Sequence, residues 1–252
     1  MSIEYWKSTL TPRPDLVDVL APLIELSKRR QKMLTIFDLE ATTFMGRHNF
    51  GITDVGMVHI NPRGSVATSG SLVNPENKID PEVVKLTGIR QDMLTHQHNW
   101  KHGWGAAWSF LAREHIVMGF NSSTFDKPAL VSQHARYGLD PLEFNEHWDV
   151  RNLYKAAAKT QKGKLEEVAN WLGIDTANFK GHRAINDAIL TAVIMANLWE
   201  KFPEHHAKLD STLVSAPTKS ASAAPLKNPL KTTVSRRTIS EAKSQAERLR
   251  ES

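Results

Sequence analysis

The sequence predicts one α/β domain with an extension at each end, and three observations support this fold class. Short runs rich in β-branched residues between Met33 and Val73 predict three consecutive strands. From there to Trp199, segments with helical periodicity alternate with short apolar runs. The composition, with 40% hydrophobic and 23% charged residues in a chain of 252, is that of a globular protein with a substantial core. The domain itself is expected to span residues 32–202.

Residues 1–31 are predicted to form a helical extension in front of this domain. A proline-containing stretch is followed by apolar residues at helical spacing between Leu16 and Ile24. The strands come next and are expected to form a meander, because glycine, asparagine and proline separate them. They are predicted at residues 33–41, 52–60 and 65–73.

The second half of the chain is predicted to consist mainly of helices. The predicted elements are helices at 81–86 and from Trp100 to Leu111, a strand at 116–121, a helix at 124–137, a short strand at 148–150, and helices at 164–173 and 184–199. The last helix is apolar on most of its circumference, which predicts that it is buried. The helix from Trp100 carries tryptophans at every fourth position, a spacing more typical of core packing than of base stacking.

Residues 203–252 are predicted to be a flexible basic tail. Serine, alanine, proline and lysine dominate up to Arg237, as in a linker, and the segment that begins at Ser240 has the pattern of a short terminal helix. The part from Val214 to Arg237 holds five Lys and Arg residues and no acid, so it accounts for the net charge of +5. Such a tail either contacts phosphates or is a solvated linker.

The composition also restricts the compartment and the chemistry. The chain has no cysteine, which excludes disulfides and thiolate metal sites and agrees with a reducing compartment. No apolar run approaches the roughly 20 residues of a membrane-spanning helix, and the first residues lack the apolar block of a signal peptide. We therefore expect a cytoplasmic protein that does not contact membranes.

Two acids end the first predicted strand. Side chains alternate along a strand, so Asp38 and Glu40 point to the same face, about 7 Å apart. Two acids on one side of an otherwise apolar strand are unfavourable unless a cation or another partner neutralises them. The alternative is that they mark the exposed end of the strand.

Two further acids and a histidine occur near predicted helix starts. Asp126 follows a strand and precedes Pro128, so it is either a site residue or a helix cap. Asp187 lies on the predicted apolar helix, where its alternative role is that of a first-turn acid favoured by the helix dipole. His182 follows Gly181, and its spacing to Asp187 makes it a candidate site residue.

These residues together predict a metal-dependent hydrolytic site. Four converging carboxylates would repel one another, whereas two divalent cations would balance them, and an all-oxygen ligand set suits Mg²⁺ or Mn²⁺. Two such ions can activate a water and clamp a phosphodiester. A neutral imidazole at His182 can accept the proton of that water.

The same residues occur in the order of the motifs of a known family. FDLEATT, NSSTFD and HRAINDA resemble the three motifs of the DEDD exonucleases of the His type, the DnaQ-like group that includes ribonuclease T and the epsilon subunit of DNA polymerase III. The resemblance extends from about Met33 to Trp199. It implies an RNase H-like fold with a mixed five-stranded sheet flanked by helices, and release of nucleoside 5′-monophosphates from 3′ ends. It implies that His182 is the general base and that two Mg²⁺ or Mn²⁺ ions are held by Asp38, Glu40, Asp126 and Asp187.

The resemblance also implies contacts with the terminal nucleotide. The candidates are Thr42, Thr43, Phe44, Leu86, Thr87 and Asn121. Ala41 follows Glu40 as in certain exoribonucleases of this superfamily, whereas HRAINDA is closer to the proofreading members. The expected substrate is a single-stranded DNA or RNA 3′ end, with DNA slightly favoured and DNA repair or proofreading as the role.

Three alternatives remain open. The first is a 3′-5′ exoribonuclease in RNA processing, and the second is a nonenzymatic module that binds nucleic acid or a partner through the same fold. The third, an RNase H-like endonuclease, is disfavoured by the spacing of His182 and Asp187. By analogy with the tethered epsilon subunit, residues 238–252 are candidates for binding a protein partner. The sequence does not predict an oligomeric state.

Overall fold

The structure, a computed structural model, describes residues 3–43, 50–177, 179 and 182–205. It divides into two units, residues 1–210 and 211–252, and the second lies wholly outside the described residues. The predicted terminal helix and nearly all of the predicted basic tail therefore lie outside the described residues, as does Phe44. All of the described residues belong to the first unit.

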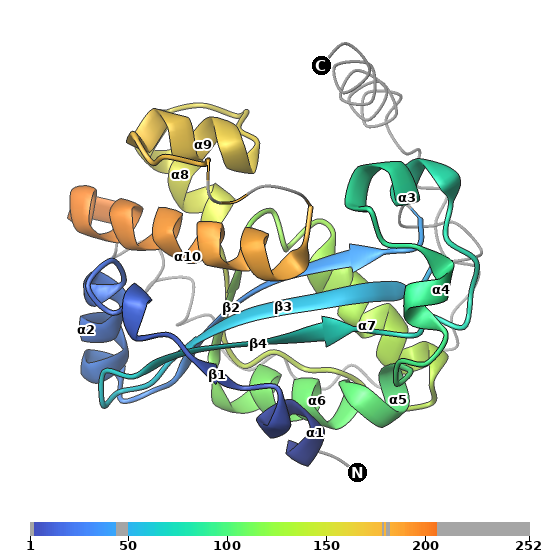
Figure 1. Ribbon diagram of the computed structural model, residues 1–252. Coiled ribbons are helices and arrows are strands. Elements are labelled where there is room, and N and C mark those ends of the chain that lie inside the picture. Colours follow the sequence, from blue (N-terminus) through green and yellow to red (C-terminus); the bar gives the residue numbers. More distant parts are fainter. Residues whose placement is uncertain (1–2, 44–49, 178, 180–181, 206–252) are drawn as a thin grey trace, which may run out of the picture. The chain divides into compact units, whose positions relative to one another are not determined.

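A mixed sheet forms the centre of this unit (Figure 1). Its strand order is β1-β4-β3-β2-β5-β6. The predicted meander is present as β2 (Leu34–Ala41), β3 (Ile52–Ile60) and β4 (Val66–Leu72), which pair in antiparallel fashion. On the other side of β2, β5 (Ile116–Gly119) and β6 (His147–Asp149) run parallel to it. The mixed sheet expected of an RNase H-like fold is thus confirmed.

The sheet has six strands where five were expected. The additional strand is β1 (Thr11–Pro12), which pairs with Thr68 and Ala67 at the edge of β4. A proline fits at such an edge because it has no amide hydrogen to donate to a ladder. Two residues are too few to show an alternating pattern, so this strand could not be predicted from the sequence.

The N-terminal segment is more divided than the sequence predicted. It contains α1 (Ile3–Ser8), the 3-10 turn η1 (Pro14–Leu16) and α2 (Ala21–Arg30). The helix that was expected from about Leu16 begins only at Ala21, with a proline in its first turn, where the missing amide hydrogen would have no partner in any case. As a result Leu16 packs in the core from outside the helix, and Val19 stays exposed.

In the part of the chain that the structure describes, nine further helical elements follow the meander. They are α3 (Pro81–Thr87), α4 (Gln91–Leu94), α5 (Trp100–Gly103), α6 (Gly105–Glu114), α7 (Asp126–Arg136), α8 (Val150–Ala158), α9 (Leu165–Leu172), α10 (Ala184–Lys201) and the 3-10 turn η2 (Pro203–His205). The long α10 lies across one face of β2 and β3, while α1, α5 and α6 lie below the other face (Figure 1). The prediction that α10 is buried is confirmed.

The tryptophan-rich helix is interrupted. Two helices, α5 and α6, meet at Trp104 in place of the single predicted helix. The break brings Gly105 so close to Leu139 that a Cβ atom at this glycine would lie 2.5 Å from the leucine Cδ1. Trp100, Trp104 and Trp108 are all fully buried, so they pack in the core, as their spacing suggested, and cannot stack on bases.

The backbone of α10 packs directly against the backbone of β3. A Cβ atom at Gly56 would lie 2.1 Å from the carbonyl carbon of Ala184 and 2.2 Å from the amide nitrogen of Ile185. Only glycine allows this approach. The first turn of α10 is therefore fixed directly above β3, next to the residues that the sequence predicted as a site.

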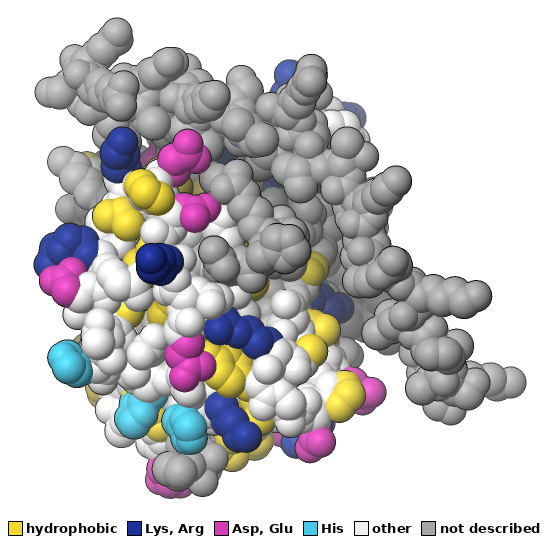
Figure 2. Space-filling model, turned by 90° about the vertical axis from the view of Figure 1, so that its right-hand side faces the viewer, with side chains coloured by type: hydrophobic (Ala, Val, Ile, Leu, Met, Phe, Trp, Pro, Cys, Tyr) yellow, Lys and Arg dark blue, Asp and Glu magenta, His cyan; other side chains and the backbone are white. Residues whose placement is uncertain are grey.

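Charge is mixed on the face seen from the side of α3 and α4. Figure 2 shows Lys and Arg side chains lying singly among Asp, Glu and His in the described part of this face. Among the described residues, no helix has both the length and the apolar character that crossing a membrane requires.

Candidate metal-binding and catalytic site

Two of the predicted acids lie at the end of β2, under α10. Asp38 pairs with Gly56 across the antiparallel ladder, and Glu40 pairs with Asp54. Directly opposed residues project to the same face, so Asp38, Glu40 and Asp54 all face α10, which approaches the sheet closely at Gly56. The regular register ends immediately after Glu40.

Asp126 reaches the same place from the other side of β2. The parallel pairing of β2 with β5 stops at Phe37 and Gly119, and the chain then turns through Asn121, which has a left-handed φ of 58°. Asp126 is the first residue of α7 and is only 4% exposed. Its carboxylate accepts the amide hydrogen of Leu39, the residue between Asp38 and Glu40. The acid thus takes the position along β2 that a longer β5 would have filled.

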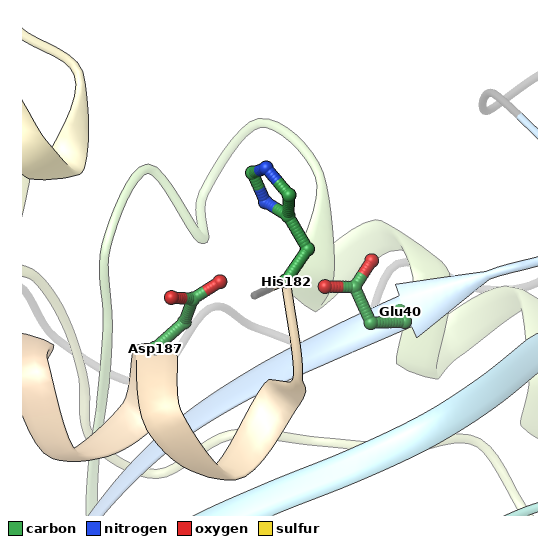
Figure 3. A group of neighbouring side chains, drawn as sticks. All are labelled: Glu40, His182 and Asp187. Carbon is green, nitrogen blue, oxygen red and sulfur yellow. The ribbon is translucent and has the colours of Figure 1, made fainter. Parts of the chain in front are cut away.

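Asp187 and His182 come from the start of α10. Asp187 lies in the first turn of the helix, and His182 lies just before the capping residue Arg183. Potential ligand atoms of Glu40, His182 and Asp187 all lie within 4.8 Å of one another. Figure 3 shows the three side chains converging from the strand, the segment before the helix and the helix itself.

Burial and mutual repulsion raise the pKa values of these acids. Burial raises the pKa of Asp38 well above its usual range, and the charges of Asp126, Glu40 and Asp187 raise it further. The pKa of Glu40 is also raised well above its usual value, first by burial and then by Asp187. Burial raises the pKa of both Asp126 and Asp187 to about 7.

The imidazole of His182 is shifted toward its neutral form. Burial lowers the pKa of His182, and the charge of Glu166, on the first turn of α9, partly opposes this change. A neutral imidazole retains a lone pair that can accept a proton. The site therefore combines several repelling carboxylates with one base.

This donor set fits divalent cations. Carboxylate oxygens are the ligands that Mg²⁺ and Mn²⁺ prefer, and burial followed by the charges of neighbouring acids raises the pKa of Asp38 and of Glu40. Arg183 lowers the pKa of Glu40, but its guanidinium Nε donates to Asp54 Oδ2 at 2.8 Å. A bound cation would relieve the repulsion that the protein leaves in place.

The structure assigns partners to several residues that the sequence did not single out. Asp54 binds Arg183, as described above. Asp149 accepts the amide hydrogens of Asn121 (2.9 Å) and Ser123 (3.0 Å), and so fixes the loop that leads to Asp126. Arg151 donates from Nη1 to Asn121 Oδ1 at 2.9 Å. In the sequence these residues have the pattern of ordinary strand and helix-start positions, so no local signal marked them.

The predicted substrate contacts are mostly engaged within the protein. Thr42 and Thr43 are buried; the Thr42 hydroxyl accepts from the Gly51 amide at 2.9 Å, and the Thr43 hydroxyl donates to Asp80 at 2.5 Å. Thr87 is also buried and donates to the Val83 carbonyl. The backbone of Thr42 is engaged as well, because its amide donates to the Gly51 carbonyl at 2.8 Å and its carbonyl accepts from the Asp80 amide at 2.9 Å.

Two other contact candidates are less enclosed. Leu86 lies on α3 and is partly exposed. Asn121 is partly exposed, and its side-chain oxygen accepts from Arg151, as described above. Their contact with a nucleotide stays a prediction.

Comparison with known proteins matches this arrangement to one family. The family model described as "Exonuclease" matches residues 35–195, which is more than half of the chain. The chain belongs to this exonuclease family. The resemblance to DnaQ-like exonucleases that the motifs indicated is thereby confirmed.

A curated relative supports the membership of the exonuclease family. The DNA polymerase III of PolC type from Caldanaerobacter subterraneus subsp. tengcongensis is 28% identical over 178 residues, which is 67% of this chain. The match spans only 12% of that polymerase. The exonuclease family thus occurs there as a small part of a much larger protein.

Solved structures of other exonucleases share the fold. Exonuclease X in complex with 5′-overhanging duplex DNA aligns over 70% of this chain and 98% of its own, with a TM-score of 0.54 and 18% identity. Escherichia coli exonuclease I in complex with a dA16 oligonucleotide aligns over 72% of this chain and 43% of its own, with a TM-score of 0.61 and 16% identity. A 3′-exonuclease that recognises the histone mRNA stem-loop aligns over 68% of this chain and 83% of its own, with a TM-score of 0.55 and 16% identity.

Proposed function

We propose that this protein is a divalent-metal-dependent exonuclease that removes nucleotides one at a time from single-stranded 3′ ends and releases nucleoside 5′-monophosphates. The observation that carries the proposal is that potential ligand atoms of Glu40, His182 and Asp187 lie within 4.8 Å of one another, beside Asp38, whose pKa the charges of Asp126, Glu40 and Asp187 raise in addition to burial. Membership of the exonuclease family supports the same reaction.

The roles of the residues follow from their positions. Asp38, Glu40, Asp126 and Asp187 would hold two Mg²⁺ or Mn²⁺ ions. Such ions, when bound, activate a water and stabilise the charge that develops on the phosphodiester and its leaving oxygen. His182 accepts the proton of the attacking water, because burial keeps its imidazole neutral.

The favoured substrate is single-stranded DNA, in repair or proofreading. The DNA complexes of exonuclease X and exonuclease I, and the PolC-type relative, support this choice. The second candidate is an exoribonuclease, which is favoured by the histone mRNA 3′-exonuclease among the structural neighbours and by Ala41 after Glu40. Discrimination would depend on contacts with the 2′-hydroxyl group.

The direct test compares matched DNA and RNA oligonucleotides labelled at the 5′ end. With Mg²⁺ or Mn²⁺, the wild type should produce a ladder that shortens from the 3′ end, and the released product should co-migrate with nucleoside 5′-monophosphates. EDTA and Asp38→Ala should each abolish the ladder. The ratio of the initial rates on DNA and on RNA identifies the favoured sugar.

Two results would overturn the proposal. Absence of shortening on both oligonucleotides, with a correctly folded protein, would favour the nonenzymatic binding module. Cleavage of a circular single strand that Asp38→Ala abolishes would instead indicate an endonuclease. A preparation of Asp38→Ala that still degrades the linear substrate would point to a contaminating nuclease.

A further inference from the structure

A fifth acid, Asp54, lies beside the proposed metal ligands but is bound differently. It is opposite Glu40 on β3 and is 2% exposed. Its Oδ2 accepts from Arg183 Nε at 2.8 Å, and its carboxylate also accepts the amide hydrogens of Ala184 and Val55. These bonds occupy the carboxylate with groups of the protein, so Asp54 is not available as a metal ligand in the way that Glu40 is.

The hydrogen bonds of Asp54 lie at the start of α10, where the helix has no side-chain cap. Arg183 is the capping residue of this helix, and its side chain makes no capping hydrogen bond. The first amide groups of a helix need an acceptor, and a negative charge near them is favourable. Asp54 supplies both functions from a neighbouring strand, because it accepts from Ala184, the first residue of the helix.

His182 and Asp187 differ in the contacts that fix their positions. Asp187 is part of the helix, whose position is fixed by buried apolar side chains and by the contact of Ala184 with Gly56. His182 precedes the helix and is only partly buried. The two residues that follow it, Arg183 and Ala184, both donate hydrogen bonds to Asp54.

We propose that Asp54 is a positioning residue. Through its hydrogen bonds to Arg183 and Ala184, it holds the proposed general base His182 beside Glu40 and Asp187. The inference rests on the proposed exonuclease function for its kinetic consequence. Its structural consequence, a fixed imidazole, can be measured without catalysis.

The test uses Asp54→Asn, which keeps the shape of the side chain and removes its charge. Loss of such a supporting interaction typically lowers activity by roughly 10- to 100-fold, and we expect this loss in kcat with little change in KM. The matched control is Glu146→Gln, because Glu146 is also buried and bound to cations, Arg30 (2.8 Å) and Lys32 (3.2 Å). Urea unfolding should show that both variants lose stability, whereas only Asp54→Asn should lose kcat.

A double-mutant cycle separates positioning from general stability. If Asp54 acts through His182, then Asp54→Asn should cause no further loss of kcat in a His182→Ala background. The same fold-loss in both backgrounds, or an unchanged kcat of Asp54→Asn in the wild-type background, would overturn the inference while leaving the exonuclease function intact. Arg183→Met, at a side chain that is 41% exposed, provides the same comparison should Asp54→Asn fail to fold.

An NMR measurement decides the inference even for an inactive protein. The imidazole Cε1–H signal of His182, assigned by its loss in His182→Ala, should shift or broaden in Asp54→Asn and remain unchanged in Glu146→Gln. An unchanged signal in Asp54→Asn would overturn the inference. An inactive wild type with the expected shift would instead overturn the proposed function alone.

Discussion

Strands β2 and β3 carry polar side chains on both of their faces, but the partners of these side chains differ between the two faces. Under α10, Asp38 and Glu40 lie among further acids, and burial with mutual repulsion raises their pKa values. On the other face, Thr35 and His59 pair across the same two strands and belong to a chain of hydrogen bonds. Thr35 and His59 are fully buried, whereas Asp38 and Glu40 are partly exposed, and the two groups also differ in their partners.

A cluster of hydrogen-bonded side chains, here called the histidine cluster, consists of Trp6, Thr35, His59, Ser69 and His115. Its hydrogen bonds form one directed chain. The Trp6 indole can only donate, and it donates to His59 Nε2 at 3.3 Å, so this nitrogen is an acceptor. His59 therefore carries its proton on Nδ1 and donates to Thr35 (3.1 Å), whose hydroxyl donates to His115 Nδ1 at 2.7 Å. Ser69 contacts His59 Nε2 as well, at 2.7 Å.

The polar groups of one face stabilise the fold, whereas we propose that those of the other face bind cations. A fully satisfied buried network rigidifies a core, whereas buried like charges destabilise it until a cation binds. Removing a group should therefore have opposite effects on the two faces. Loss of a carboxylate should stabilise the cation-free protein, and loss of a hydroxyl from the histidine cluster should destabilise it.

The largest effect is expected for Asp38→Ala. It should reduce exonuclease activity to the detection limit, while the melting temperature in EDTA should rise because one of the repelling carboxylates is gone. For the wild type, a cation at about 100 times its Kd should add about 2.7 kcal/mol of stability, and the variant should lose most of this gain. Differential scanning calorimetry with and without Mg²⁺ measures both changes. A lower melting temperature of the variant in EDTA would contradict the comparison.

The next largest effect is expected for His182→Ala. General bases typically contribute roughly 10²- to 10⁴-fold, so kcat should fall by this amount. Stabilisation by Mg²⁺ should persist, because the carboxylates are assigned to the metal and the imidazole to the proton. The rate of mononucleotide release and the Mg²⁺-dependent melting temperature provide the two readouts. Loss of the Mg²⁺ effect together with kcat would make His182 a ligand.

Periodicity predicted the parts of the fold that have a repeating pattern. The meander β2–β4 and the apolar α10 follow from alternation and from a helical stripe, both of which are local properties. The two-residue β1 pairs with the edge of β4, and the split between α5 and α6 lies next to the close contact of Gly105 with Leu139. Such features depend on tertiary contacts that a local pattern does not contain.

The residues of the candidate site were also predictable only where a local sequence pattern marks them. Alternation placed Asp38 and Glu40 on one face, and the spacing in HRAINDA linked His182 to Asp187. The anchor at Asp54 was not predictable, because in ITDVGMVHI it has the pattern of any strand residue. Only the register that pairs it with Glu40, and the approach of α10 over Gly56, give it a role.

A smaller effect is expected from acid on the histidine cluster. Burial, with a contribution from His115, lowers the pKa of His59 to about 3, and burial lowers that of His115 to about 4. The unfolded chain takes up these protons near pH 6.5 and the folded protein does not. The stability that the cluster contributes is therefore complete above about pH 6.5 and is lost as the pH falls toward about 4.

The variant His115→Gln isolates this contribution. Urea unfolding at intervals between about pH 7.5 and pH 4 should show a shallower loss of stability for the variant than for the wild type. Taking the difference in slope removes the contributions of other titrating groups, including the acids under α10. Equal slopes for the variant and the wild type would show that the histidine cluster does not control acid sensitivity.

The smallest effects are expected from single hydroxyls of the histidine cluster, and their order tests the direction of the chain. Thr35→Val leaves a buried donor on His59 and a buried acceptor on His115 without partners, which should cost about 1–3 kcal/mol of unfolding free energy. Ser69→Ala should cost less, about 0.5–1.5 kcal/mol, because His59 Nε2 still accepts from Trp6. Urea unfolding at pH 7.5 measures both values, and kcat should stay unchanged because these side chains face away from Asp38. A larger cost for Ser69→Ala than for Thr35→Val would mean that the chain of donors does not run from Trp6 to His115.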